Sequence, residues 1–356
     1  MDDAEAVSPV PREIWRSVLA SDPDAMPSQS PEWMDASCAG SPWQDASRLY
    51  VTAEGRRVVF PLLRLGVGSA STVMSPRRGW GYGGIIADGG VVPGDIKTVS
   101  EDLQSLSALS LWLRPNPIHA HLWDKFIPEL RRTPRKSFIV DLEGGAEAVR
   151  ARFRRSALKG IKTAEKAGVR VETGTHGRLL PEFFQLTVTA RAYWAERQHE
   201  PNWLAQMRGR LRDSEAKWAG IAKHLGPDLQ VSIAWHNDQP VAGGIVVRGP
   251  NAHGTRAAMD PASRNLGASH LLNWVVLQKA CDDGARWFHM GESATPGADE
   301  FKRYLGAQRY DFDEITFERI PISAAKRVVR SAVKRAVRFR DDSPELHSDN
   351  PPAIES

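Results

Sequence analysis

The fold of this chain is decided by residues 271–306, LLNWVVLQKACDDGARWFHMGESATPGADEFKRYLG. The apolar spacing predicts a buried helix, then a short strand, a loop and a second helix that opens on Phe301-Lys302 and reaches Gly306. A strand between two helices indicates a mixed α/β layer. The polar cluster Gly291-Glu292-Ser293 follows the strand, and ligands of open α/β sheets collect at the carboxyl ends of strands.

Working outward, the second half of the chain continues the same alternation of helices and strands. Residues 146–167 predict one long helix, because Val149, Phe153, Ala157, Ile161 and Ala164 recur at helical spacing before the stop at Gly168. Further helices are predicted at 179–197, 202–224 and 267–283, and strands at 169–172, 229–236, 241–248, 255–259, 286–290 and 308–317.

The first half shows a sparser version of this order. Helices are predicted at 13–20, after Pro31 and around 118–126. Strands are predicted at 48–53, 56–65, 109–113 and 137–142, the first two as a hairpin across Glu54-Gly55. A glycine and aromatic loop, GWGYGG, occupies residues 79–84. The two termini, 1–12 and 341–356, are polar and contain proline, so we expect both to be disordered tails.

Composition favours a two-domain globular protein. The chain has 356 residues, of which 41% are hydrophobic and 25% charged. No apolar run approaches the length of a membrane span, and the acidic start MDDAEAVSPVPRE lacks the apolar region of a secretory signal. The only two cysteines, Cys38 and Cys281, are far apart, which favours a reducing compartment. We therefore expect a cytoplasmic protein without a metal site.

Positive charge is clustered, although the net charge is only +4. Residues 146–167 hold seven cations and two carboxylates, and residues 324–340 hold seven cations and no acid. The second segment predicts an amphipathic helix with valines and alanines on one face. Packing on the protein or an RNA contact is favoured there, with a peripheral contact to anionic lipid as a further alternative.

The motifs of the second half resemble those of the FemAB-like family. A helix is followed by a strand that ends in Gly291-x-Ser293, and the motif F-K-x-x-x-G-A then runs from Phe301 to Ala307. The resemblance implies a tandem of two GNAT-like α/β domains, here 13–135 and 136–320, with the second better defined. The residues after it predict a basic amphipathic helix at 321–340. The resemblance also implies an enzyme that moves an acyl group onto an amine.

Lys302 is the first candidate for chemistry. In tRNA-using members of the family the lysine of this motif lies beside the ester under attack, so the resemblance implies that Lys302 stabilises the developing oxyanion or a nearby phosphate. A cation in the first turn of a helix opposes the helix dipole and needs an anionic partner. The alternative is a solvated lysine beside a core phenylalanine, Phe301.

Glu292 is the candidate base. A carboxylate at the end of a strand is placed to accept a proton from an attacking amine, with Ser293 beside it as a substrate contact. Relatives often have an acid two places before the glycine, where this chain has His289. Either residue, or substrate-assisted proton transfer, remains open.

Two motifs bear on the acyl donor. Arg264-x-x-Gly267 matches part of the pyrophosphate motif of coenzyme A-dependent GNAT enzymes, and Ser269 departs from it. Arg155 and Lys159 lie in a basic run before Gly168-Val169 that resembles the family's R-R-x-x-x-K segment and suits a phosphate backbone. A plain helix start and a solvated helix face are the respective alternatives.

The acceptor contacts are expected in two other places. Arg191 and Tyr193 form a family-like cluster in which an arginine grips a carboxylate or phosphate. Trp80, Tyr82, Gly83 and Gly84 belong to the GWGYGG loop, whose glycines permit close backbone approach and whose rings stack on ligands. A plain structural turn is the alternative for this loop.

These observations predict an acyltransferase that forms an amide. It takes an aminoacyl group from aminoacyl-tRNA and passes it to an amine of a cell-wall precursor or secondary metabolite. Acyl coenzyme A is the alternative donor. A non-catalytic module that binds RNA or a membrane surface is the second alternative. We expect a monomer, with no cofactor besides the donor co-substrate.

Overall fold

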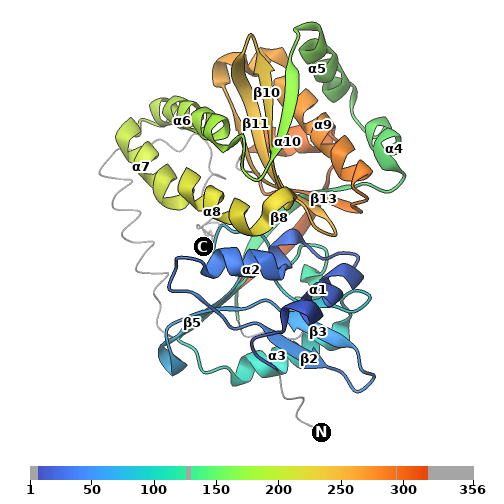
Figure 1. Cartoon of the computed structure of the whole chain (residues 1–356), viewed down its shortest axis with the longest axis vertical. Coiled ribbons are helices and arrows are strands. Elements are labelled where there is room, and N and C mark those ends of the chain that lie inside the picture. Colours follow the sequence, from blue (N-terminus) through green and yellow to red (C-terminus); the bar gives the residue numbers. More distant parts are fainter. Residues whose placement is uncertain (1–6, 126–129, 294, 320–356) are drawn as a thin grey trace, which may run out of the picture. The chain divides into compact units, whose positions relative to one another are not determined.

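The computed structural model describes residues 7–125, 130–293 and 295–319, which form two compact units (Figure 1). The first unit runs to Ser137 and also takes in Gly249–Asn251 and the strand from Tyr310. The second comprises Phe138–Arg248 and Ala252–Arg309. The units are therefore not contiguous stretches, because a strand from the end of the chain completes the first one.

The second unit is built on a mixed sheet. Its strand order is the end of β8 (Arg131–Asp141) from Phe138 onward, then β13 (Trp287–Gly291), β12 (Ala252–Met259), β11 (Gln239–Val247), β10 (Leu229–His236) and β9 (Arg170–Thr175). All neighbours are antiparallel except β12 and β13, which are parallel and pair only at Ala252–Phe288 and His253–His289. Beyond those positions the two strands separate.

Helices cover both faces of this sheet (Figure 1). On one face α4 (Gly145–Ala151), α5 (Arg155–Lys166) and α9 (Ala268–Asp282) bury a shared core that includes Ile161, Leu277 and Phe288. On the other, α6 (Leu180–Arg197) packs Phe183 and Leu186 close to Gly243 of β11. Helices α7 (Asn202–Arg212), α8 (Glu215–Leu225) and α10 (Pro296–Tyr304) complete the unit.

Two predicted helices are each divided in the structure. The helix expected at 146–167 is broken at 152–154, where Phe153 turns into the core against Trp274 and the amide of Arg154 donates to Tyr304 O at 2.9 Å. The helix expected at 202–224 is broken at Asp213-Ser214. There Ser214 Oγ accepts from Lys217 N and starts a new helix as its N-cap.

The first unit holds a three-stranded sheet, β2 (Arg48–Val51), β3 (Arg57–Phe60) and β6 (Ile86–Ala87). It also holds strands in the order β1 (Gln44–Asp45), β4 (Leu63–Leu65), β5 (Thr72–Ser75), β7 (Ser110–Leu113) and β14 (Gln308–Glu318). The predicted hairpin is confirmed for β2 and β3, but β4 leaves it for the other sheet. The helical parts are α1 (Arg12–Ser21), α2 (Pro31–Cys38), α3 (Pro93–Ser105) and a 3-10 turn at Ala120–Lys125.

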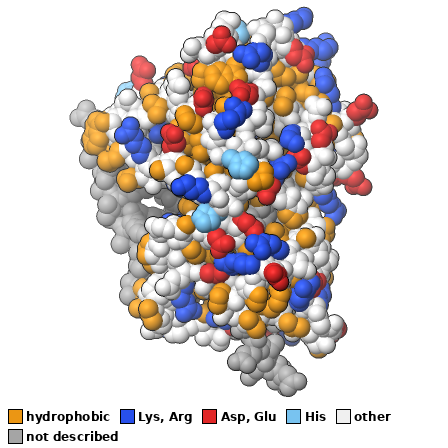
Figure 2. Space-filling model, viewed as in Figure 1, with side chains coloured by type: hydrophobic (Ala, Val, Ile, Leu, Met, Phe, Trp, Pro, Cys, Tyr) orange, Lys and Arg blue, Asp and Glu red, His pale blue; other side chains and the backbone are white. Residues whose placement is uncertain are grey.

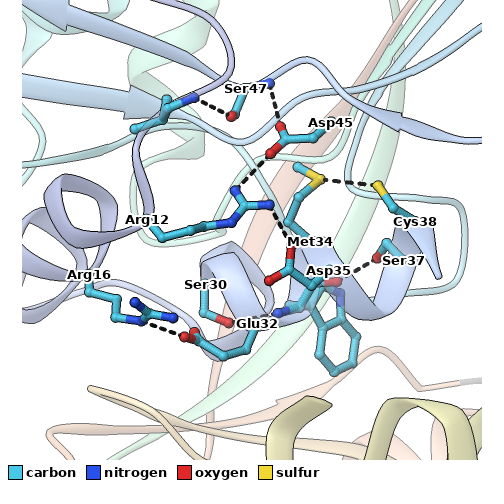
Figure 3. A network of polar contacts seen from close by, with 12 residues as sticks. Arg12, Arg16, Ser30, Glu32, Met34, Asp35, Ser37, Cys38, Asp45 and Ser47 are labelled. Carbon is cyan, nitrogen blue, oxygen red and sulfur yellow. Dashed lines mark hydrogen bonds and ion pairs between the residues drawn. The ribbon is translucent and has the colours of Figure 1, made fainter. Parts of the chain in front are cut away.

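The expectation of a disordered tail over 1–12 is wrong for residues 7–12, and residues 1–6 lie outside the described residues. Val7 pairs with Leu49 by backbone hydrogen bonds, and Val10 is buried with its amide bound to Ser47 Oγ. Figure 3 shows Arg12, the first residue of α1, held between Asp35 at 2.5 Å and Asp45 at 2.7 Å. Residues 7–12 are therefore part of the first unit. The predicted 324–340 helix and the 341–356 tail lie outside the described residues.

The fold class is confirmed as mixed α/β, with helices on both faces of the sheet in the second unit. Among the described residues, no helix combines the length and apolar character needed to cross a bilayer.

Candidate functional site

The carboxyl end of β13 has the local geometry of a site. Gly291 lies in the left-handed region at φ +69, and the pairing of β13 with β8 shifts register between His289 and Gly291. Such a bulge re-aims the backbone at a strand end and is common beside active sites. The two residues that follow, Glu292 and Ser293, leave the sheet at this point.

Lys302 lies in the last turn of α10, so the expectation that it opens this helix was wrong. The helix begins earlier, because Thr295 Oγ1 accepts from Ala298 N as the N-cap and Pro296 occupies the first position. At the C-terminal end the dipole is negative and favours a cation. The lysine therefore needs no anionic partner to offset the dipole, and that argument for its role is lost.

Lys302 nevertheless reaches the end of β13. Its Nζ donates to Gly291 O at 3.0 Å and to Glu292 O at 2.7 Å, and lies 5.5 Å from the centre of the buried Phe138 ring. The ammonium therefore ties α10 to the strand end. A positive charge is thus held at the carboxyl end of β13.

The candidate bases differ in accessibility. Glu292 and Ser293 are half-buried, whereas His289 is fully buried. The His289 ring lies 6.4 Å from that of His253, its partner residue across β12 and β13. Within the part of the chain that the structure describes, Ser293 Oγ is buried without a hydrogen bond. Of the two proposed bases, Glu292 is the one nearer to solvent.

Phe301 packs inward. Its ring is 4.9 Å from that of His270 in the first turn of α9, and His270 in turn lies against Gly160 of α5. Burial lowers the pKa of His270 below its ordinary value. The structure thus gives Phe301 a core contact, and its predicted role in binding substrate stays a prediction.

The start of α9 lies against α5. A Cβ on Gly267 would come within 2.2 Å of Gly160 O, and Gly267 adopts φ +71. Both facts require glycine at this position. The match to the pyrophosphate motif therefore has a structural explanation in helix packing. Arg264, the other match, is exposed on the 3-10 turn Pro261–Leu266.

Helix α5 carries an exposed row of cations, Arg155, Lys159, Lys162 and Lys166, which we call the α5 stripe. Their spacing of four, three and four residues places them on one helix face, opposite the buried Ala157, Ile161 and Ala164. Among the described residues none of the four has an ion-pair partner. In Figure 2 blue side chains gather at the upper right, where Figure 1 places α5.

Arg191 lies between helices of the second unit. Its guanidinium donates to Thr187 Oγ1 at 2.7 Å and to Gln206 Oε1 at 3.2 Å, and packs on Gly209 of α7. Burial lowers the pKa of Arg191 from its ordinary value. These contacts join α6 to α7. Tyr193, one of its predicted neighbours in the site, accepts a hydrogen bond from Arg197 Nη1 at 3.2 Å.

The GWGYGG loop belongs to the first unit, and its residues differ in burial. Tyr82 is buried, with its ring against Phe312 and its hydroxyl 2.8 Å from Ser137 Oγ. Gly83 and Gly84 are buried against Ser75, whose Oγ accepts from Gly84 N at 3.1 Å. Trp80 is partly exposed and stacks with Arg77 at 4.8 Å. Of the two aromatic side chains in the loop, only that of Trp80 is accessible to a ligand.

Gly267, the N-cap of α9, and Lys302 of α10 lie on elements that each pack on α5. The α5 stripe lies on the exposed face of α5, opposite its buried residues. The sequence reasoning missed Phe138 near Lys302 and Gly160 beside Gly267. It counted Lys162 and Lys166 among the cations of residues 146–167 but did not name them as site residues, although their spacing from Arg155 and Lys159 places all four on one helix face. The described residues contain no group of three or more potential metal ligands.

A mixed sheet whose two parallel strands separate, with helices on both faces, is the architecture of a GNAT fold. The comparisons agree: residues 151–303 match the family model described as an acetyltransferase (GNAT) domain, so this part of the chain is a GNAT domain and the protein is an acyltransferase.

Two solved structures show the wider fold. FemX has 13% identity and a TM-score of 0.65, with 87% of this chain and 96% of that chain covered. The C-terminal DUF2156 domain of an Agrobacterium fabrum protein assigned as a lysylphosphatidylglycerol synthetase has 11% identity and a TM-score of 0.50. That match covers 90% of this chain and 96% of that chain. The resemblance to the FemAB-like family is confirmed at the level of the fold. No curated protein matches the chain.

Proposed function

We propose that this acyltransferase takes an aminoacyl group from aminoacyl-tRNA and forms an amide on the amine of a cell-wall precursor or secondary metabolite. The observation that carries the proposal is the α5 stripe. Four cations on one exposed helix face, with no ion-pair partner among the described residues, suit a polyanion with regularly spaced charges. Over eleven residues of helix the stripe extends about 16 Å, enough for several phosphates.

The coenzyme A alternative loses its main sequence support. Gly267 is required by the approach of Gly160 and by its positive φ, whether or not a pyrophosphate binds there. The FemAB-like resemblance adds the expectation of a tRNA donor, which the FemX fold supports only at the level of architecture.

The chemistry is a transfer from an ester to an amine. The acceptor nitrogen attacks the ester carbonyl carbon, and the carbonyl oxygen becomes an oxyanion. The ester C–O bond then breaks, and the ribose hydroxyl of the tRNA leaves with a proton that originates from the amine. We assign Lys302 to the oxyanion, because its charge is fixed at the end of β13. We assign Glu292 to the proton.

The direct test uses the two donors in parallel. The full-length protein is incubated with radiolabelled aminoacyl-tRNA or acetyl coenzyme A and a panel of amine acceptors, and the label that passes to an amide is counted. Transfer from aminoacyl-tRNA supports the proposal. Transfer from acetyl coenzyme A alone refutes it.

Binding of tRNA should depend on salt and on the α5 stripe. Each phosphate neutralised contributes a slope of about −0.7 to −0.9 in log K against log salt. We expect the Arg155→Ala, Lys159→Ala double variant to reduce this slope by between one and two. The matched control is Lys97→Ala with Lys223→Ala, which removes two exposed cations from other helices. An equal effect in the control would show that only net charge matters.

The test of Lys302 must separate stabilisation of the oxyanion from the structural role of holding α10 to the end of β13. Lys302→Met should lower turnover by about tenfold to a thousandfold, the range for loss of one transition-state donor. Lys302→Arg keeps the charge and the bonds to the two carbonyls, so it should recover part of the rate. Full activity in a folded Lys302→Met protein would contradict the assignment.

An acyl coenzyme A-dependent N-acetyltransferase is the second candidate. It is favoured by the family description of residues 151–303 as an acetyltransferase domain. Tight binding of acetyl coenzyme A by the unaltered protein, measured by calorimetry, would move the assignment to this donor.

A further inference from the structure

Helix α7 presents its large apolar side chains to solvent. Trp203 is 68% exposed, Met207 45% and Leu211 82%. Their spacing of four residues places them on one face, which we call the α7 stripe. In Figure 2 orange side chains lie at the left margin, where Figure 1 places α7. A surface helix normally turns its apolar face inward, so this arrangement is inverted.

The opposite face of α7 is the one that packs. Ala205 is buried, and Gly209 lies against the guanidinium of Arg191. Neither of these residues has a large apolar side chain. The α7 stripe therefore contributes little to the core of the second unit, and its large side chains require another explanation.

Positive charge accompanies the stripe. Arg208, Arg210 and Arg212 lie on α7, which contains no acidic residue. Arg208 is paired with Glu200 at 2.8 Å, whereas Arg210 is exposed and has no ion-pair partner among the described residues. Apolar side chains with flanking arginines are the pattern of a helix that lies in a membrane interface.

Other occupants fit this surface less well. At about 200 Å² for a large side chain, the α7 stripe exposes roughly 400 Å². That is about half of the 800 Å² per partner that a stable dimer buries. The sequence of segment 324–340 has seven cations and no acid, so its charge does not complement the arginines of α7. RNA phosphates could pair with the arginines, but RNA offers no apolar environment for Met207 and Leu211.

We propose that α7 is a docking site for an anionic lipid bilayer, with Trp203, Met207 and Leu211 inserted at the boundary between headgroups and acyl chains. Arg210 contacts lipid phosphate beside them. The helix lies parallel to the surface, at a depth of about 5 to 10 Å. This proposal goes beyond acyl transfer and does not depend on which donor is used.

The test is co-sedimentation of the full-length protein with vesicles of phosphatidylcholine that contain about 30 mol% phosphatidylglycerol, or none. Leu211→Glu and Trp203→Ser are each compared with the unaltered protein. Both side chains are exposed, so circular dichroism and thermal unfolding should be unchanged. The matched control is Val67→Glu, at a residue of the first unit that is 87% exposed.

We expect binding only to the anionic vesicles, weakened by salt and reduced at least about tenfold by Leu211→Glu, with Val67→Glu unchanged. Failure of the unaltered protein to bind anionic vesicles would overturn the proposal. If the two α7 variants bind anionic vesicles as well as the unaltered protein does, then the membrane contact lies elsewhere and the proposal is also overturned. Loss of tRNA binding or of self-association in these variants, without vesicle binding, would assign the face to RNA or to a second copy.

Discussion

Replacing Gly267 by alanine tests how the start of α9 is held. The new Cβ would lie 2.2 Å from Gly160 O, and this contact is with backbone, which cannot rotate away. The residue would also have to keep φ +71, which L-residues adopt at a cost. Both effects act on the folded state and should lower the free energy of unfolding.

The two effects have estimable sizes. A non-glycine residue in a sparsely populated backbone region costs about 1 to 3 kcal/mol. Overpacking by an added carbon costs about 1 to 3 kcal/mol more when neighbours must shift. A combined loss of about 4 kcal/mol should lower the midpoint of thermal unfolding by about 8 to 16 °C in a unit of this size.

The matched control is Gly168→Ala. Gly168 adopts φ +75, but a Cβ there would meet nothing within 4 Å. It therefore isolates the backbone cost, about 1 to 3 kcal/mol, which is about half of the combined loss expected for Gly267→Ala. The assay is thermal unfolding followed by circular dichroism. If Gly267→Ala is no less stable than Gly168→Ala, then α5 does not restrict this position and the argument against coenzyme A fails.

Three further outcomes follow from buried groups of the second unit. Burial lowers the pKa of His270, so below about pH 6.5 the unfolded state binds more protons. The free energy of unfolding should therefore fall as pH drops from about 6.5 towards the lower folded pKa, and level off below it. Urea titrations at several pH values should show a smaller fall in His270→Gln. Asp213→Ala leaves Arg256 and Lys217 without their carboxylate and should cost about 3 kcal/mol by chemical denaturation. Arg191→Met should lower the unfolding midpoint while the KM for acceptor stays within about twofold, since its guanidinium donates to Thr187 of α6 and Gln206 of α7. A large rise in KM at unchanged stability would favour the acceptor role.

Element type was predictable where local pattern and tertiary packing agree. The strands near 229–248 and the helix near 267–283 combine clear periodicity with clear stops, and the structure has them as β10, β11 and α9. The break at 152–154 was not predictable, because no proline or glycine marks it. It depends on Phe153 meeting Trp274 and on a hydrogen bond from Arg154 to Tyr304, residues more than a hundred positions away.

The geometry of the candidate site was only partly predictable. The motif named Lys302 but placed it at the start of a helix, whereas it lies in the last turn of α10, although Thr295-Pro296 is a readable helix start. Its contact with the end of β13 was not predicted. Arg191 and Tyr82 show the limit of motif reasoning. Polar and aromatic side chains in such a pattern can either pack within the protein or bind a ligand. Only their burial and their contact partners distinguish these two roles.

The contribution of β14 to the first unit affects how the protein is made. Its residues Ile315–Glu318 pair with Ser110–Leu113 of β7, and Phe312 packs against Tyr82. During synthesis the ribosome must therefore translate nearly the whole chain before the N-terminal unit has its last strand, so this unit cannot simply fold first. A fragment cut after Ser137 would leave the edge of β7 uncovered, and unpaired edges promote aggregation. The first unit is therefore better expressed as part of the full-length protein than as an excised domain.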